Sequence, residues 1–250
     1  LFMKLGIVIP TYEKQKNIKK ISNSFKELKN IQIFFCFVDG SYTTKTIQEI
    51  KKNFKKNYKI INQSKKNKIG LFNLSKRCEA SLIGFKWFVK NKKVDLITDM
   101  DADLSSDPKD IKKAIKIYNK NKSDLIIGSK YLLGSRVIKR KPIRVLCSKI
   151  YTFACKVLIS KEISDYSAGF RFYSIKSLKK LIQKKQRYKS PSQHLENLLF
   201  YFENKHKIDE FPAQYQDTDE NSKSIYLTHI LIFIYQLSNI LFQYHLRKLK

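Results

Sequence analysis

Short apolar segments alternate with amphipathic segments through the first half of this 250-residue chain. Runs rich in β-branched and aromatic residues predict strands at residues 5–10, 31–40, 58–63, 94–101 and 123–131. The intervening patterns predict helices at residues 17–28, 44–54, 74–91 and 107–118. Such alternation favours a single α/β domain with a mostly parallel, doubly wound sheet.

The loops that follow the predicted strands are polar. Their sequences are TYEKQ, DGSYTT, DMDADLSSD and GSKYLLGS. In a doubly wound sheet, ligands bind beyond the carboxyl ends of the strands. These four loops therefore form the predicted binding edge.

The third of these loops is unusually acidic, with Asp99, Asp101, Asp103 and Asp107 close together. Asp107 precedes a proline and fits a helix N-cap. An isolated pair such as Asp101 and Asp103 can simply shape a turn. At a ligand-binding edge, however, the two carboxylates suit Mg²⁺ or Mn²⁺, which also binds phosphates and neutralises a diphosphate leaving group. The pattern indicates a nucleoside-diphosphate donor.

Basic residues outnumber acidic ones by 51 to 21, which gives a net charge of +30. This charge invites a polyanion such as a nucleic acid, an anionic membrane or a phosphorylated substrate. Only seven of the 51 are arginine, so drift towards lysine on solvated faces is an alternative explanation. The four cysteines form no C-x-x-C pair, which favours reduced thiols in a cytosolic protein, and the strand pattern at the N-terminus predicts no signal peptide.

The second half of the chain is less regular. A basic stretch at 134–144 precedes an apolar helical pattern that extends to about residue 160, and another helix is predicted near 193–204. Residues 225–246 are largely apolar but contain several polar side chains, so they are marginal for a membrane span. We expect a domain at 1–224 and, at 225–250, an apolar or amphipathic helix that associates with the membrane surface or docks on the domain.

Six motifs occur in a recognisable order: VIPTYEKQKNI, FVDGSYTT, DMDADLSSDP, DLIIGSKY, SAGFRFY and ENSK. Together they resemble family 2 glycosyltransferases over about residues 5–225. The likeness is greatest to the branch of dolichyl-phosphate mannose synthases and polyprenyl-phosphate glycosyltransferases. The resemblance implies the GT-A fold of nucleotide-diphospho-sugar transferases.

The resemblance also implies the residues of a donor site. This predicted set comprises Pro10, Tyr12, Asp39, Asp101, Ala102, Asp103, Lys130 and Lys223. Within it, Asp101 and Asp103 would hold Mg²⁺ or Mn²⁺, with Ser105 beside them. Lys130 stands where the family usually has arginine, and Lys223 matches a basic residue that closes over the phosphates.

An acceptor side is implied in the same way. Lys130, Arg144, Ser148 and Arg171 match positions that contact the acceptor phosphate. The predicted catalytic residues are Asp101, Asp103 and Arg144. The SAGFRFY region matches the loop and strand that line this side, through Asp165, Ser167, Gly169 and Arg171.

The implied function is inverting transfer of a hexose from a nucleotide sugar, of the GDP-mannose or UDP-glucose type, to a polyprenyl phosphate. A lipid phosphate is already an anionic nucleophile, so cations that bring the two anions together matter more than a strong base. The resemblance also implies that the protein acts at the cytoplasmic face of the membrane, where a partner subunit could anchor it. The single tryptophan, Trp87, rules out the Q-x-x-R-W signature of processive synthases.

Three family positions differ here. Val38 replaces the first acid of D-D-G-S, Lys14 stands where P-T-Y-N-E has its glutamate, and Asp217 occupies a late basic position. Two alternatives therefore stay open. One is a family 2 transferase that acts on a cell-envelope glycan or another lipid-linked acceptor. The other is an inactive scaffold or a basic nucleic-acid binder, although the acidic loop disfavours nucleic acid as a partner.

Overall fold

The computed structural model describes residues 3–28, 30–63, 76–184, 187, 192–217 and 227–248. Its strands are β1 (Met3–Thr11), β2 (Ile31–Asp39), β3 (Tyr58–Asn62), β4 (Leu96–Asp99), β5 (Leu125–Ser129), β6 (Arg136–Ile138), β7 (Arg171–Ser174), β8 (Ile208–Pro212) and β9 (Gln214–Gln216). Its helices are α1 (Gln15–Phe25), α2 (Lys45–Asn53), α3 (Lys76–Asn91), the 3₁₀ turn η1 (Pro108–Asp110), α4 (Ile111–Asn121), α5 (Pro142–Leu158), α6 (Ile175–Gln183), α7 (Gln193–Glu203) and α8 (Leu227–Lys248).

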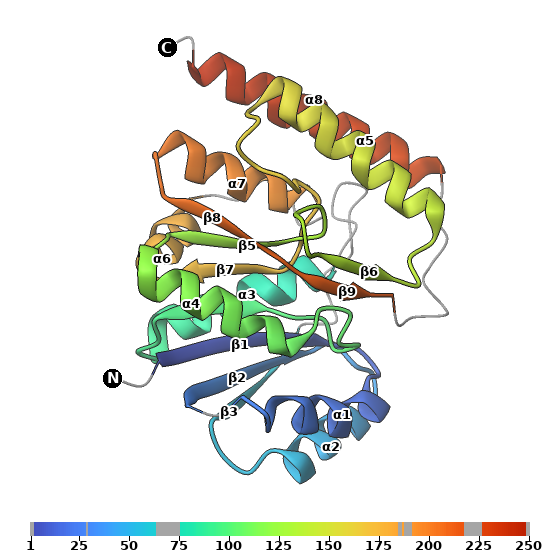
Figure 1. The fold of residues 1–250 in the computed structure, drawn as a ribbon. Helices are drawn as coiled ribbons and strands as arrows, with labels where there is room; N and C mark the ends of the chain where they lie inside the picture. The colour runs from blue at the N-terminus through green and yellow to red at the C-terminus, as the bar shows by residue number, and fades with distance from the viewer. Residues whose placement is uncertain are drawn as a thin grey trace.

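Seven strands form the central sheet in the order β3-β2-β1-β4-β7-β5-β8 (Figure 1). All neighbouring pairs are parallel except those of β7, which runs antiparallel to both β4 and β5. The mostly parallel α/β sheet predicted from the sequence is confirmed, with β7 as an antiparallel insertion. The insertion brings the chain segment before β7 to the edge where the predicted loops meet.

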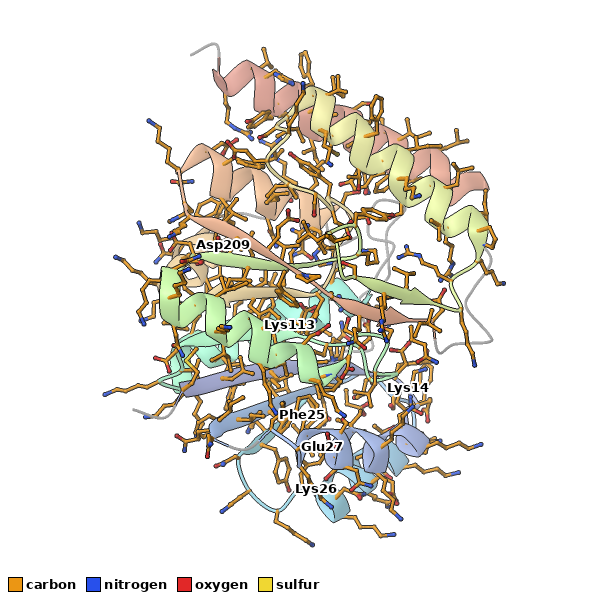
Figure 2. All side chains as sticks on the ribbon, viewed as in Figure 1. Lys14, Phe25, Lys26, Glu27, Lys113 and Asp209 are labelled. Carbon is orange, nitrogen blue, oxygen red and sulfur yellow. The ribbon has the colours of Figure 1, made fainter. Side chains whose placement is uncertain are left out.

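Helices cover both faces of this sheet. Alternate residues of β1 point to opposite faces, so Ile7 packs with α1, α2 and α4, while Val8 packs with α3, α6 and α7. The end of α1 also separates buried from exposed side chains. The ring of Phe25 lies 5.1 Å from that of Phe35 in β2, between centroids, whereas Lys26, just after the helix, is exposed (Figure 2). The resulting three layers hold the carboxyl ends of the strands rigidly.

Beyond the sheet, α5 and α8 lie side by side, and β6 pairs with β9 in a small parallel ribbon (Figure 1). The rings of Tyr151 and Phe233 join α5 to α8 at 5.3 Å, and Ser192 donates to Gln236 at 2.7 Å. The predicted C-terminal helix therefore packs against the body, and its association with a membrane stays a prediction. Among the helices that the structure describes, none combines the length and apolar character of a membrane span.

Several predicted boundaries shift. The expected strand at 94–101 is shorter, because β4 covers only Leu96–Asp99 and the chain turns at Ala102 and Asp103. The predicted cap at Asp107 is present, since its carboxylate accepts from the Lys109 amide at 2.8 Å, but it caps the 3₁₀ turn η1 that leads into α4. Residues 74, 75 and 218–226, which belong to expected segments, lie outside the described residues.

Candidate active site

The ends of β1 and β2 form the first part of the site. Asp39, the last residue of β2, is buried and accepts from the hydroxyls of Thr11 at 2.8 Å and Ser41 at 2.7 Å. These bonds hold the carboxylate at the strand end with its charge compensated by two donors. The predicted contact of Asp39 with a nucleotide stays a prediction.

Glu13 shapes the loop beside Asp39. Its carboxylate accepts from the amides of Tyr42 at 2.9 Å and Thr43 at 3.1 Å and from the Thr43 hydroxyl at 2.8 Å. These bonds, above all those with Thr43, lower the pKa of Glu13. Glu13, rather than Lys14, thus supplies the acid of this loop. Tyr12 remains more than half exposed and meets Tyr42 edge to face, at 6.0 Å between ring centroids.

The acidic loop after β4 is bridged by an arginine that the sequence analysis did not single out. Arg77, near the start of α3, donates from Nη1 to Asp99 at 2.9 Å and from Nε to Asp101 at 2.5 Å. Although burial opposes it, the pull of Asp101 and Asp99 raises the pKa of Arg77 well above its ordinary value. One guanidinium therefore compensates two of the four clustered acids, and Asp99 is a buried structural partner rather than a free ligand.

The next residues form a tight turn. Leu104 adopts a left-handed conformation with φ of 59°, and the Ser105 amide donates to Oδ1 of Asp103 at 2.9 Å. The Ala102 carbonyl accepts from the Asn17 side chain at 3.0 Å, which ties the turn to α1. Ser105 itself is buried, so the turn presents Asp101 and Asp103 more than Ser105 to a ligand.

These two carboxylates fit a divalent cation that is shared with a diphosphate. Within the described part of the chain, the Oδ2 atoms of Asp101 and Asp103 accept no hydrogen bond, so each keeps an oxygen for a ligand. The described residues contain no group of three or more acidic, histidine or cysteine side chains able to hold a metal. Mg²⁺ commonly binds through one or two carboxylates while phosphates and water complete its shell, which matches this donor set.

Lys130, just after β5, forms a buried ion pair. Its Nζ lies 2.8 Å from Oδ2 of Asp165, and its amide donates to the same oxygen at 3.0 Å. Burial lowers the pKa of Lys130, although Asp165 opposes that shift. Burial also works against ionisation of Asp165, but Lys130 and the Ser167 hydroxyl outweigh it and keep the pKa of Asp165 below its ordinary value. The pair therefore consists of an ammonium group on Lys130 and a carboxylate on Asp165.

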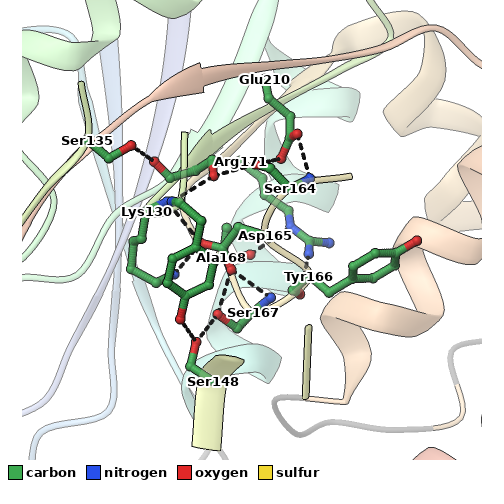
Figure 3. A network of polar contacts seen from close by, with 12 residues as sticks. Lys130, Ser135, Ser148, Ser164, Asp165, Tyr166, Ser167, Ala168, Arg171 and Glu210 are labelled. Atoms are coloured by element: carbon green, nitrogen blue, oxygen red, sulfur yellow. Dashed lines mark hydrogen bonds and ion pairs between the residues drawn. The ribbon is translucent and has the colours of Figure 1, made fainter. Parts of the chain in front are cut away.

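Hydroxyl groups continue from this pair towards α5 (Figure 3). Tyr131 donates to Ser148 at 2.6 Å, Ser148 lies 2.5 Å from the Ser167 hydroxyl, and Ser167 donates to Asp165 at 2.6 Å. Because the Ser167 proton is used on Asp165, Ser148 must donate to Ser167. The chain thus has one proton order that ends on the carboxylate, and it joins the predicted residues Lys130, Asp165, Ser167 and Ser148.

Arg171 occupies a different place from the one expected. It is fully buried, and its guanidinium donates to the carbonyls of Ala168 at 2.9 Å, His194 at 2.5 Å and Tyr166 at 3.3 Å. The guanidinium thereby fixes the loop before β7 and joins it to the start of α7. This placement favours a supporting role over the predicted direct contact with an acceptor phosphate.

Two arginines, Arg144 and Arg140, flank the site. Nη1 of Arg144, in the first turn of α5, lies 3.7 Å from a carboxylate oxygen of Asp217. Arg140 stacks on the ring of Tyr215 at 5.2 Å and was not predicted. The predicted residue Lys223 lies outside the described residues.

Two neighbouring cavities connect these groups. The first, of about 230 Å³, is lined by residues that include Arg77, Asp101, Lys130, Arg140, Ser167 and Gly169. The second, of about 400 Å³, is lined by Lys130, Tyr131, Val137, Lys139, Arg140, Val145 and Lys149. Lys130 and Arg140 belong to both walls. The structure therefore places a first cavity of mixed charge, which contains Asp99, Asp101 and three cations, next to a second that is basic and partly apolar.

Comparison of the sequence with models of known protein families agrees with this fold and this acidic loop. The chain matches the model of glycosyl transferase family 2 over residues 6–182, which is most of its length. The chain belongs to glycosyl transferase family 2. The family resemblance stated from the motifs is thereby confirmed, as is the GT-A-like α/β fold.

Two curated relatives are polyprenyl-phosphate enzymes. A dolichol-phosphate mannosyltransferase of Pyrococcus furiosus is 28% identical over 172 residues, which are 67% of this chain and 45% of that protein. An undecaprenyl-phosphate mannosyltransferase of Micrococcus luteus is 25% identical over 100 residues, which are 40% of each protein. The matched part of this chain thus spans less than half the length of either relative.

Solved structures show the same fold at low identity. A complex of Mycobacterium tuberculosis glucosyl-3-phosphoglycerate synthase with Mn²⁺, UDP-glucose and phosphoglyceric acid superimposes with a TM-score of 0.65. It is 10% identical and covers 96% of this chain and 80% of its own. Staphylococcus aureus TarS, residues 1–349, gives a TM-score of 0.55 at 16% identity, over 86% of this chain and 60% of that one.

Proposed function

We propose that this chain transfers a hexose, with inversion, from a nucleoside-diphosphate sugar to a polyprenyl phosphate at the cytoplasmic face of a membrane. The family membership supports sugar transfer, and the two curated relatives support a lipid phosphate as the acceptor. The donor is of the GDP-mannose or UDP-glucose type. A partner subunit that anchors the enzyme is compatible with this proposal.

The observation that carries the proposal is the pair of cavities that share Lys130 and Arg140. The first cavity contains Asp101, which with Asp103 suits a cation and the donor diphosphate. The second cavity combines the cations Lys139 and Lys149 with the apolar side chains of Val137 and Val145. A phosphate attached to an isoprenoid chain has the matching chemistry, since its head is anionic and its tail is apolar.

In this scheme the acceptor phosphate attacks the anomeric carbon while the bond to the diphosphate breaks. Lys130 and Arg140 lie between the two cavities and would reduce the repulsion between the two anions. Mg²⁺ or Mn²⁺ held by Asp101 and Asp103 would supply neutralisation of the charge that develops on the leaving diphosphate. Because the nucleophile is already ionised, a single displacement needs no strong base and inverts the configuration.

The exposed face of α5 supports a membrane location. Ile143, Leu146, Ile150, Phe153 and Val157 recur at spacings of three and four residues, and each is more than half exposed. Exposed lysines flank this stripe at positions 139, 141 and 149. An anionic bilayer offers both an apolar interior and a negative surface, so the stripe and its lysines complement it. The second cavity opens beside this helix, through Val145 and Lys149.

The deciding experiment measures binding and transfer together. GDP, UDP, GDP-mannose and UDP-glucose are titrated by calorimetry with and without Mn²⁺, using the wild type and Asp103→Ala. Transfer to a short-chain polyprenyl phosphate is then followed with the donor that binds. We expect metal-dependent binding of one nucleotide and its sugar, loss of that binding in the variant, and an inverted product.

Other results would assign the chain differently. Metal-dependent donor binding with transfer only to a glycan or sugar hydroxyl would favour the alternative acceptor. Failure of every nucleotide to bind would instead indicate a scaffold whose donor pocket is disabled by the changes at Lys14, Val38 and Asp217.

A further inference from the structure

His194 contributes to the wall of the first cavity, although the motifs did not mark it. It is the second residue of α7, and its carbonyl is held by the buried Arg171 at 2.5 Å. Its Nε2 lies 3.8 Å from the position that a Cβ atom on Gly169 would occupy. Gly169 and His194 line the cavity together, and the absence of a side chain on Gly169 leaves Nε2 accessible from within.

The imidazole of His194 is neutral. Burial, together with the nearby cations Arg171, Arg77 and Lys130, lowers the pKa of His194 well below its ordinary value. His194 also lines a smaller cavity behind the first. The other titratable groups that line these two cavities are Cys78, Asp99, Asp101, Arg140, Tyr173 and Tyr215. A ring in these surroundings is a poor proton acceptor.

The buried nitrogen indicates which tautomer is present. Nδ1 is buried and has no hydrogen-bond partner among the residues that the structure describes. An orphaned buried N–H is rarer than an acceptor with an unused lone pair. The proton therefore belongs on Nε2, the nitrogen near Gly169, and His194 presents a donor to the cavity.

We propose that the Nε2–H group of His194 donates a hydrogen bond to a hydroxyl oxygen of the transferred hexose, which makes His194 a specificity-determining residue. This inference rests on the proposed function. The sugar must lie between the leaving diphosphate near Asp101 and the attacking phosphate near Lys130, and His194 lines the cavity that contains both residues. A neutral donor suits a neutral hydroxyl. The charged groups of the ligands, their phosphates, suit the cations Arg77, Lys130 and Arg140 that line the same cavity.

The test compares two amide variants that differ in reach. The side-chain amide of Gln can place a donor near the position of Nε2, whereas the shorter Asn cannot. We expect His194→Asn to weaken Mn²⁺-dependent binding of the cognate nucleotide sugar by about three- to tenfold, the effect of one lost neutral hydrogen bond. Binding of the free nucleoside diphosphate should be unchanged, and His194→Gln should restore most of the lost affinity. Urea unfolding of each variant checks that α7 stays folded.

The outcomes separate this inference from the proposed function. Equal weakening of the nucleotide and the nucleotide sugar, or no weakening of either, would overturn the role of His194 while leaving the transferase intact. A pH–rate limb of the wild type that disappears in His194→Gln would show a general base instead and would also overturn it. If the wild type binds no nucleotide at all, the proposed function itself fails.

Discussion

Arginine use around the site is informative because this chain otherwise prefers lysine. Of its seven arginines, Arg77 and Arg140 line the first cavity, Arg144 pairs with Asp217, and Arg171 is fully buried below the site. Lysine cannot replace the planar fork with which Arg77 contacts Asp99 and Asp101 together. The scarcity of arginine in this lysine-rich chain is therefore a signal that could have pointed to Arg77 from the sequence.

Replacing Arg77 tests its role at the acidic loop. In Arg77→Gln the buried Asp99 loses its charged partner and, among the side chains that the structure describes, keeps the Ser81 hydroxyl at 2.8 Å. We expect the free energy of unfolding to fall by about 2 kcal/mol, as for a lost hydrogen bond to a charged group. Urea denaturation measures the change. Arg247→Gln is the matched control, because that arginine pairs with Glu203 on the surface and should cost less than about 1 kcal/mol.

The buried pair of Lys130 and Asp165 predicts an acid-sensitive stability. The pKa of Asp165 is lowered on folding, so its contribution is present above the unfolded value near 3.8 and is lost as the pH falls through the folded value. We expect Asp165→Asn to be less stable than the wild type by about 3 kcal/mol near neutral pH. The difference should shrink as unfolding curves are recorded at lower pH. A gap that stays constant below pH 3.8 would show that the pair is not ionic.

At the scale of elements, α3 lies unusually close to the sheet and thereby positions Arg77. A Cβ atom on Gly84 would approach the Val8 side chain to 2.4 Å. Alanine favours a helix over glycine by about 1 kcal/mol, but overpacking a core costs about 1–3 kcal/mol. We expect Gly84→Ala to be destabilised by about 1 kcal/mol or more in urea unfolding. In a chain that already carries Gly84→Ala, the further change Val8→Ala should lower the free energy of unfolding by less than it does in the wild type. If the two changes are simply additive, Gly84 and Val8 are not in close contact.

The stripe on α5 gives a prediction for membrane binding. Phe153 is 70% exposed, and a side chain of its kind gains about 1.5–3 kcal/mol on full burial. We expect Phe153→Glu to weaken binding to anionic phospholipid vesicles at least about tenfold in a flotation assay. Gln48→Glu, an exposed position on α2 with the same change in charge, is the control and should bind like the wild type. Equal behaviour of the two variants would exclude α5 as the docking element.

At the scale of the whole molecule, the net charge of +30 attracts any polyanion, so salt dependence separates general attraction from docking. Raising the salt from about 0.1 M to about 1 M shortens the Debye length from about 10 Å to about 3 Å. We expect binding to duplex DNA to vanish over this range, whereas vesicle binding falls but persists through the apolar face of α5. Cosedimentation at both salt levels measures this. If both bindings vanish together, the charge alone accounts for them.

The sequence by itself determined the layered α/β fold and the position of the acidic loop. Both depend on local rules, because apolar periodicity distinguishes strand from helix and the chain direction places strand ends at one edge. The Asp107 cap follows from the same local chemistry, whereas the end of β4 was predicted two residues late. The ordered motifs then predicted the family over about residues 5–225, and the family comparison confirms it over residues 6–182.

Only the tertiary structure decided which side chains meet. The antiparallel insertion of β7 places Asp165 against Lys130, which is 35 residues earlier in the chain. Arg77 reaches the acidic loop because α3 packs closely on β1, and His194 reaches the cavity because Arg171 holds its carbonyl. Periodicity and turn chemistry act over a few residues, whereas these contacts arise from the packing of separate elements, and no local pattern specifies them.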